Sequence, residues 1–312
     1  MNATGISDNA GDLARIGRVL NIQRFALHDG SGVRTTVFLQ GCPLRCAWCQ
    51  NPESIASEPQ IMYAAARCAV CRACEATCPQ GAHRFNGGEH VYDRTRCVRC
   101  GACVDACPTG ALELAGRAQS VAAVLDEVQR DVPYYDESGG GLTISGGEPL
   151  AQPEVAAALA RQAAVRNLHT CLDTTGFAPW TALAPLVGAV DLFLYDVKLL
   201  DDDAHRRWTG QGNGLILANL DRLIAAGASI ELRCPIIPTV NDTDAHLDGL
   251  ARLVARLGGR VGCTILPYHG MAGSKYDRLG LTPPLGDLPS IPAERPRQWV
   301  ERLRQRGVDA HL

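Results

Sequence analysis

Three cysteines lie within eight residues near the start of the chain. Cys42, Cys46 and Cys49 have the spacing C-x3-C-x2-C. A cube of four irons and four sulfurs has four irons to ligate, and a structural zinc ion also takes four protein ligands. Three thiolates on one short loop can hold three corners of a cube and leave the fourth iron open. The spacing therefore indicates a metal centre that can also bind a small molecule.

Eight further cysteines form two runs of identical spacing, C-x2-C-x2-C-x3-C, each followed by proline. This is the spacing of bacterial ferredoxins with two clusters, in which the fourth cysteine of each run ligates the other cluster. A pair of zinc knuckles is the alternative. The pattern predicts two closed [4Fe-4S] clusters for electron transfer, one held by Cys68, Cys71, Cys74 and Cys107, the other by Cys97, Cys100, Cys103 and Cys78.

The composition limits the cellular compartments and the classes of binding partner that we expect for this protein. The chain has 312 residues, 14 cysteines and a formal net charge of −3, so it carries no general basic surface for nucleic acid. No apolar run approaches the roughly 20 residues of a membrane span. Residues 1–18 lack the apolar segment of a secretory signal, and clustered cysteines favour a reducing compartment. We expect a cytoplasmic protein without a membrane partner, and we expect Cys171, Cys234 and Cys263 to be core residues.

Apolar runs alternate with helical patterns along most of the chain. Six such units imply a parallel sheet, and we expect an α/β fold, an incomplete (β/α)6 TIM-like barrel with its chemistry at the C-terminal ends of the strands. Residues 18–66 and 115–312 would form this barrel, and residues 67–114 would form an inserted ferredoxin-like domain. The predicted strands are 35–40, 142–145, 169–173, 190–196, 230–237 and 261–268, and the predicted helices are 121–130, 154–165, 181–187, 214–226, 244–257 and 294–306.

The segment Leu142 to Leu150, LTISGGEPL, ends a predicted strand in two glycines and an acid. Glycines let a ligand approach the backbone closely. With this segment and the three-cysteine loop, the chain resembles the radical S-adenosylmethionine (SAM) enzymes. The resemblance covers nearly its whole length. The resemblance implies that the amine and carboxylate of SAM chelate the open iron. It also implies that Gly146, Gly147 and Glu148 hold the amine and that Trp48 packs near the adenine. An ordinary core aromatic is the alternative for Trp48.

Four more segments resemble the activating enzymes of glycyl radical enzymes: Arg24 to Arg34, Leu172 to Gly176, Leu194 to Lys198 and Leu266 to His269. The two cysteine runs match the longer subgroup of that family. The resemblance implies that the protein reductively cleaves SAM to methionine and a 5′-deoxyadenosyl radical, which abstracts a hydrogen from a glycine of the partner enzyme. The family often has Asn or Ser where this chain has Thr175, a difference that we expect to be harmless.

The same resemblance assigns the remaining site residues. Asp173 and Asp196 would bind a monovalent cation beside the SAM carboxylate, and Lys198, counted among the catalytic residues with the three cysteines, would pair with that carboxylate. Strand-end salt bridges are the alternative for these three residues, and a structural role is the alternative for His269. The further cofactor contacts that it implies are Thr174, Arg233 and His269, and the implied contacts with the glycine loop of the partner are Asp29, Gly30 and Arg34, although a plain turn at Asp29-Gly30 is an alternative.

Two other functions compete with an activating enzyme. One is a radical SAM enzyme that acts on a small molecule, and the other is a ferredoxin-type electron carrier. For an activating enzyme we expect a monomer that takes electrons from flavodoxin or ferredoxin. Candidate partners by resemblance are glycerol or propanediol dehydratase, choline lyase, isethionate lyase, benzylsuccinate synthase and arylacetate decarboxylases.

Overall fold

The computed structural model of the chain describes residues 7–258, 261–286, 288–292 and 294–312. Its main sheet has the strand order β13-β12-β11-β10-β9-β8-β2-β1-β7. From β2 to β12 the neighbouring strands are parallel, which confirms the six predicted parallel strands. The strands of this sheet are β1 (Ile16–Ala26), β2 (Arg34–Leu39), β7 (Arg117–Ser120), β8 (Gly141–Gly146), β9 (Thr170–Thr174), β10 (Leu192–Asp196), β11 (Ile230–Ile236), β12 (Gly262–Pro267) and β13 (Ala310–His311).

Three strands extend the sheet beyond the predicted six. β1 pairs antiparallel with β2 on one side and with β7 on the other, and β13 adds a parallel strand beside β12. Because β7 and β13 lie at opposite ends of the strand order, the sheet is open. It resembles an unclosed part of a barrel, in which ligands bind at the C-terminal ends of the parallel strands.

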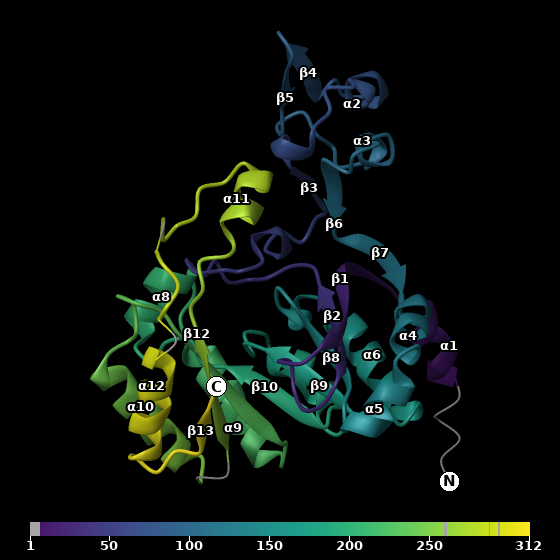
Figure 1. Cartoon of the computed structure of the whole chain (residues 1–312). Helices are drawn as coiled ribbons and strands as arrows, with labels where there is room; N and C mark the ends of the chain where they lie inside the picture. The colour runs from purple at the N-terminus through teal and green to yellow at the C-terminus, as the bar shows by residue number, and fades with distance from the viewer. Residues whose placement is uncertain (1–6, 259–260, 287, 293) are drawn as a thin grey trace.

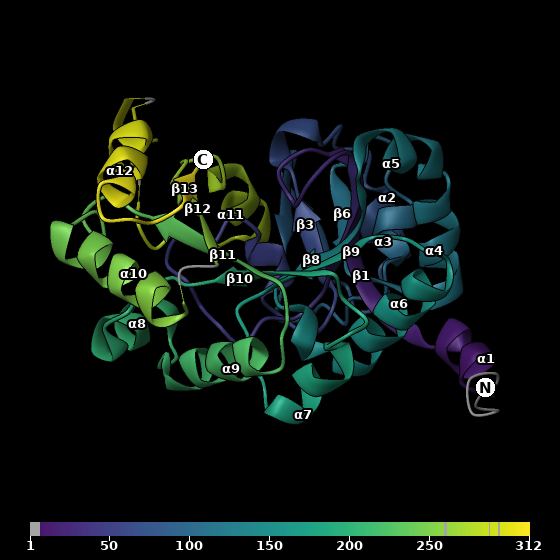
Figure 2. The ribbon, with the colours of Figure 1, turned by 90° about the horizontal axis from the view of Figure 1, so that it is seen from below.

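Helices cover the outer face of the sheet, where α4, α6, α7, α9 and α10 form an arc in Figure 2. Alanines at 156, 158 and 160 of α6 are fully buried and let this helix approach the strands closely. The predicted helix 181–187 is wrong in part, because α7 ends at Leu183 and a 3-10 turn follows. Pro185 lacks the N–H that would continue the helix. The helices are α1 (Ser7–Ala14), α2 (Ala73–Thr77), α3 (Ala102–Asp105), α4 (Val121–Gln129), α5 (Val132–Ser138), α6 (Pro153–Val165), α7 (Trp180–Leu183), α8 (Asp202–Thr209), α9 (Gly214–Ala225), α10 (Asp244–Arg256), α11 (Gly273–Leu279) and α12 (Glu294–Arg304).

The longest of these helices, α6 and α10, have 13 residues each. A membrane-spanning helix needs roughly 20 apolar residues. In the described part of the chain, no helix has both the length and the apolar character to cross a membrane.

The segment between β3 (Gln60–Tyr63) and β6 (Leu112–Ala115) projects from the sheet, as Figure 1 shows. β3 and β6 pair antiparallel and form a two-stranded stalk. Beyond the stalk lie α2, α3 and the hairpin of β4 (His83–Asn86) and β5 (Glu89–Tyr92). This segment has its own small core around Ile61, Cys74, Cys103 and Leu112.

Candidate active site

The three-cysteine loop follows directly on β2 and is fixed by backbone hydrogen bonds. Gly41 and Cys42 donate to the carbonyls of Ser54 (2.8 Å) and Ile55 (3.1 Å). On the other side, Arg45 N–H donates to the carbonyl of Thr209 at 2.7 Å. The loop is therefore held from both of its sides before any cofactor binds.

The thiols of this loop lie in a low-polarity environment. Burial raises the pKa of Cys42 to about 12 and the pKa values of Cys46 and Cys49 to about 11. Thiols with such values keep their protons at neutral pH until a metal displaces them. Three soft donors on one loop fit an iron–sulfur cluster.

A cavity of about 1060 Å³ lies beside the three thiols. Its size is at the upper end of ligand pockets, which span about 300–1,000 Å³. Three predicted site residues, Glu148, Thr174 and Arg34, are buried behind its wall. The predicted site residues that line the cavity are Cys42, Cys46, Cys49, Trp48, Gly146, Gly147, Asp173, Asp196, Lys198, Arg233, His269, Asp29 and Gly30.

The glycine turn at the end of β8 lies against the cysteine loop because β2 and β8 are parallel neighbours, with Leu39 paired to Gly146. Gly146 has φ of +144°, and a Cβ there would lie 2.1 Å from the Leu39 carbonyl oxygen. A Cβ on Gly147 would lie 2.9 Å from the Cβ of Cys42. Only glycine fits at either position, so the two residues bring bare backbone to the cavity wall beside the thiols.

The Glu148 carboxylate is buried and accepts hydrogen bonds from neighbouring protein groups. Its Oε1 accepts hydrogen bonds from the Leu150 N–H (3.0 Å) and the Thr174 hydroxyl (2.6 Å). Its Oε2 accepts from the N–H (2.8 Å) and the hydroxyl (2.6 Å) of Thr175. Burial raises the pKa of Glu148, and these hydrogen bonds act in the opposite direction. Glu148 and Thr174 therefore fix the turn after β9 to the glycine turn.

We expect a Glu148→Gln variant to be less stable. A glutamine keeps one acceptor oxygen, and its NH2 group would face two of the present donors, leaving buried donors unsatisfied at a cost of about 1–3 kcal/mol. Each kcal/mol corresponds to a Tm lowered by about 1.5 °C in a chain of 312 residues. Thermal unfolding of the metal-free protein measures the effect. Glu154→Gln, at a side chain 76% exposed, is the control, and equal Tm values for the two variants would contradict this role of Glu148.

Lys198 and Asp196 form an ion pair on the cavity wall. The Lys198 Nζ lies 2.7 Å from Asp196 Oδ2, and the side chains are 13% and 19% exposed. Burial opposes the charge of Lys198, but the Asp196 carboxylate outweighs it, and the pKa of Lys198 is raised. Lys198 is therefore charged at any physiological pH.

Asp173 and Arg233 lie on the strands that flank Asp196. Asp173 accepts a hydrogen bond from the Ser145 hydroxyl (2.8 Å), and burial raises its pKa. Arg233, paired in register with Asp196, donates to the His28 carbonyl (3.1 Å) and lies 3.9 Å from Asp29. Its buried Nε has no partner among the described residues. The cavity wall thus offers carboxylates and cations close together, which suits a zwitterionic ligand.

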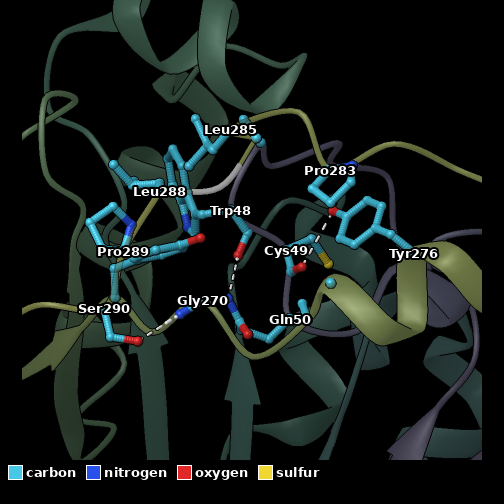
Figure 3. A pocket seen from close by; sticks show the side chains of 15 residues that line it. Trp48, Cys49, Gln50, Gly270, Tyr276, Pro283, Leu285, Leu288, Pro289 and Ser290 are labelled. Carbon is cyan, nitrogen blue, oxygen red and sulfur yellow. Dashed lines mark hydrogen bonds between the residues drawn. The ribbon is translucent and has the colours of Figure 1, made fainter.

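Trp48 is 8% exposed and packs with Leu199 and Ile237. It also lines both the large cavity and a smaller pocket of about 290 Å³. In Figure 3 the Trp48 ring lies near Leu285 and Leu288, which belong to the segment after α11. His269 is exposed at the cavity, and its carbonyl accepts a hydrogen bond from Gln50 at 3.0 Å.

Helix α11 holds the cysteine loop from the side of this smaller pocket. The Tyr276 hydroxyl donates to the Cys49 carbonyl at 3.3 Å (Figure 3), and Lys275 pairs with Glu53 at 2.9 Å. The same helix contacts the stalk, where Arg278 pairs with Glu113 at 2.5 Å. Sequence reasoning missed these residues, because a seven-residue polar helix gives no signal of partners more than 150 positions away.

The hairpin between β1 and β2 forms another part of the wall. The Asp29 carboxylate accepts a hydrogen bond from the Thr36 hydroxyl (2.8 Å), and Gly30 has φ of +121°. Arg34 is fully buried and donates to the Thr143 hydroxyl (2.6 Å) and to the carbonyls of Leu142 (2.5 Å), His169 (3.1 Å) and Ser31 (3.1 Å). The Arg34 side chain therefore points into the sheet and supports the hairpin, whereas Asp29 and Gly30 line the cavity.

The other eight cysteines line two pockets in the projecting segment. The backbone N–H groups of Ala82 and Arg99 each donate to a cysteine sulfur, that of Cys78 and that of Cys97, at 3.3 Å. Such N–H to sulfur contacts are typical of ligand sulfurs in iron–sulfur sites. One pocket is lined by Cys68, Cys71, Cys74 and Cys107, and the other by Cys78, Cys97, Cys100 and Cys103.

Two histidines that sequence reasoning did not single out lie at these pockets. His83 lines the pocket of Cys97, and His90 lines the pocket of Cys68. Burial lowers the pKa of His83 to about 4 and also lowers that of His90. Both rings are therefore neutral near pH 7.

The comparison with known families identifies the class of this protein. The sequence model of the radical SAM superfamily matches residues 36–251, which include the cysteine loop and the glycine turn. The chain belongs to the radical SAM superfamily. This family implies a [4Fe-4S] cluster and SAM, and the three half-buried thiols beside a large cavity fit that pair of cofactors.

Several curated relatives narrow the class further. The (2S)-3-sulfopropanediol sulfolyase activating enzyme of Bilophila wadsworthia is 43% identical, over 86% of this chain and 90% of its own length. The isethionate sulfite-lyase activating enzyme of Oleidesulfovibrio alaskensis is 40% identical, over 89% and 91%. The benzylsuccinate synthase activating enzyme of Thauera aromatica is 38% identical, over 94% and 92%. Within the superfamily, the protein is thus a glycyl radical enzyme activating enzyme.

Proposed function

We propose that this protein generates the glycyl radical of a partner enzyme in the cavity beside Cys42, Cys46 and Cys49. When bound, the cluster and SAM supply a one-electron cleavage that gives methionine and a 5′-deoxyadenosyl radical, which removes a hydrogen atom from the glycine Cα of the partner. The observation that carries the proposal is the shared cavity. It is lined by the thiols, by the glycine turn and by a row of charged strand-end residues.

The chain's own residues bind and orient SAM in this proposal. The backbone of Gly146 and Gly147 accepts hydrogen bonds from the amine, since Glu148 is engaged inside the protein. Lys198 and Arg233 pair with the carboxylate. Trp48 and His269 pack beside the adenine.

Asp173 and Asp196 hold a monovalent cation near that carboxylate. Two carboxylates on adjacent strands repel each other unless a cation reduces their mutual repulsion. The ordered pairing of β9 with β10 brings both acids to the same wall. Lys198 already balances Asp196, so the cation mainly compensates Asp173.

Residues 67–114 form, in this proposal, a ferredoxin-like domain with two [4Fe-4S] clusters, inserted into a core of residues 18–66 and 115–312. The separation of the cysteines into two pockets of four, each with one cysteine from the other run, supports it. The domain relays electrons from a flavodoxin or a ferredoxin to the catalytic cluster. We further propose that the protein is a monomer in the cytoplasm, where its many thiols stay reduced.

The glycine loop of the partner enters the cavity beside the hairpin that carries Asp29 and Gly30. The relatives act with different partners, which include sulfopropanediol, isethionate and benzylsuccinate enzymes. The partner of this protein is a glycyl radical enzyme, like the enzymes that these relatives activate.

The test is an anaerobic assay of 5′-deoxyadenosine release with reduced, reconstituted protein. We expect about twelve irons per chain. We also expect release to depend on a glycyl radical enzyme and an EPR doublet of a glycyl radical to appear in that partner. Release that depends on a small metabolite and ignores every partner protein would support a small-molecule enzyme instead. About eight irons, with none at Cys42, Cys46 and Cys49, would contradict the catalytic site.

A further inference from the structure

His83 and His90 connect the two cysteine pockets of the projecting segment. The rings face each other across the hairpin of β4 and β5, with 2.9 Å between His83 Nδ1 and His90 Nε2. His83 lines the pocket of Cys78, Cys97, Cys100 and Cys103, and His90 lines the pocket of Cys68, Cys71, Cys74 and Cys107. One ring must donate its N–H to the other, so the pair forms a direct hydrogen-bonded link between the pockets.

The environment of His90 brings both of its ring nitrogens close to ligand sulfurs. His90 Nε2 lies 3.7 Å from Cys74 Sγ, and His90 Nδ1 lies 3.9 Å from Cys68 Sγ. The ring stacks on Phe85 with 4.6 Å between centroids, and Tyr63 packs against it edge-on at 4.6 Å. The ring is therefore held in a fixed orientation with both nitrogens near one cysteine set, and because the neutral ring carries a single N–H, only one of them can donate to a sulfur.

The environment of His83 differs. Its ring is 1% exposed and stacks on Tyr92 with 4.7 Å between centroids. Its Nε2 is buried and has no partner among the described residues. His83 Nδ1 faces His90 Nε2. If His83 Nδ1 carries its hydrogen and donates to His90 Nε2, the single hydrogen of the His90 ring lies on Nδ1, beside Cys68 Sγ.

The internal repeat shows that these histidines make the two pockets unequal. A shift of 29 residues relates Cys68 to Cys97, and the same shift relates Ile61 to His90 and His83 to Leu112. Of these repeat-related residues, each pocket is thus lined by one that is aliphatic and one that is a histidine, but at opposite positions: Ile61 and His83 in one, Leu112 and His90 in the other. In the pocket of Cys97, the position that corresponds to His90 is the apolar Ile61.

Hydrogen bonds to the sulfurs of a cluster stabilise its more negative, reduced form and raise its reduction potential. We infer that His90 raises the potential of the cluster at Cys68, Cys71, Cys74 and Cys107 above that of its repeat-related twin, and that His83 is the positioning residue that orients the His90 ring. This inference rests on the proposed two-cluster domain. Its consequence is an order of reduction, in which the cluster of the Cys68 set is reduced first.

The test is an EPR-monitored redox titration of the full chain. A Cys46→Ala background removes the catalytic cluster, so that the signals of the other two are observed alone. In protein labelled with ¹⁵N-histidine, pulsed EPR should show histidine nitrogen coupling in the signal that appears first. His90→Leu should lower the reduction equilibrium constant of that cluster by about tenfold, which is about 59 mV for one electron, and leave the second cluster unchanged.

Two further variants separate donation from packing. His90→Gln keeps an N–H donor and should retain most of the potential, whereas His83→Leu should give a shift in the same direction as His90→Leu but smaller. Equal potentials before and after His90→Leu, or equal shifts of both clusters, would overturn the inference. If His90→Leu fails to fold, the labelled Cys46→Ala protein that keeps both His83 and His90 still tests the inference. Absence of histidine nitrogen coupling in its first signal would overturn the inference.

Iron analysis distinguishes this inference from the proposed function. About eight irons in the Cys46→Ala background show that both clusters are present, so unchanged potentials then count against His90 alone. Absence of iron from the Cys68 and Cys97 sets counts against the two-cluster domain. A single metal ion held by Cys74, His83 and His90, whose donor atoms lie within 4.8 Å of one another, would overturn the inference as well.

Discussion

A Cys46→Ala variant is expected to lose all release of 5′-deoxyadenosine while keeping about eight of about twelve irons. Cys46 lies in the middle of the cysteine loop, and the loop backbone is held by Ser54, Ile55 and Thr209 rather than by thiols. The loop should therefore keep its shape, but two thiolates cannot retain the catalytic cluster. Iron analysis and an anaerobic assay of SAM cleavage measure the two effects separately.

Cys263→Ala is the matched control for this variant. Cys263 is a fully buried cysteine of β12 whose sulfur contacts that of Cys234 at 3.5 Å, and it does not line the cavity. The control should keep about twelve irons and its activity. Retention of full activity by Cys46→Ala would contradict the proposed catalytic site and favour a simple electron carrier.

A Lys198→Met variant is expected to bind SAM about 10- to 150-fold more weakly, with unchanged iron content. A hydrogen bond to a charged group contributes about 1.5–3 kcal/mol, and each 1.4 kcal/mol is a factor of ten in affinity. Removing Lys198 also leaves Asp196 without its partner at 2.7 Å, so two carboxylates repel the carboxylate of SAM. Equilibrium binding of SAM to the reconstituted protein measures the change.

Arg256→Met is the control for the loss of an ion pair. Arg256 pairs with Asp221 at 2.6 Å, and both side chains are about half exposed, where such pairs contribute little. Its SAM affinity should match that of the unsubstituted protein. Equal SAM affinity for Lys198→Met would show that the Lys198–Asp196 pair is only a strand-end salt bridge.

Local sequence patterns predicted the parallel strands because most of them are short apolar runs buried on both faces, as in β8 and β11, whereas β12 alternates between buried and partly exposed residues. The glycine turn lies beside the cysteine loop because β2 and β8, which follow each other in the series of parallel strands, are neighbours in the sheet. Such neighbouring is a regular property of these folds. The antiparallel β1 and β7 were not predicted, because β1 alternates between buried and exposed residues over only part of its length.

The inward direction of Arg34 and Glu148 was also beyond local patterns. Both are charged residues, which are mostly exposed in proteins unless they are paired. Their partners, such as His169 for Arg34 and Thr175 for Glu148, flank the two ends of β9, 135 and 27 positions further along the chain. Only the register of the folded sheet decides whether such a side chain faces the ligand or supports the wall behind it.

The stalk of β3 and β6 gives the protein a modular architecture. Gln60 and Ala115 are paired neighbours, so the projecting segment leaves and rejoins the core at one place. Closely spaced ends allow a domain to be gained or lost without rearranging its host. The segment can therefore be replaced or removed as a unit while the ends of its host stay together, and α11, which contacts both the stalk and the cysteine loop, is the main link that such an exchange would have to preserve.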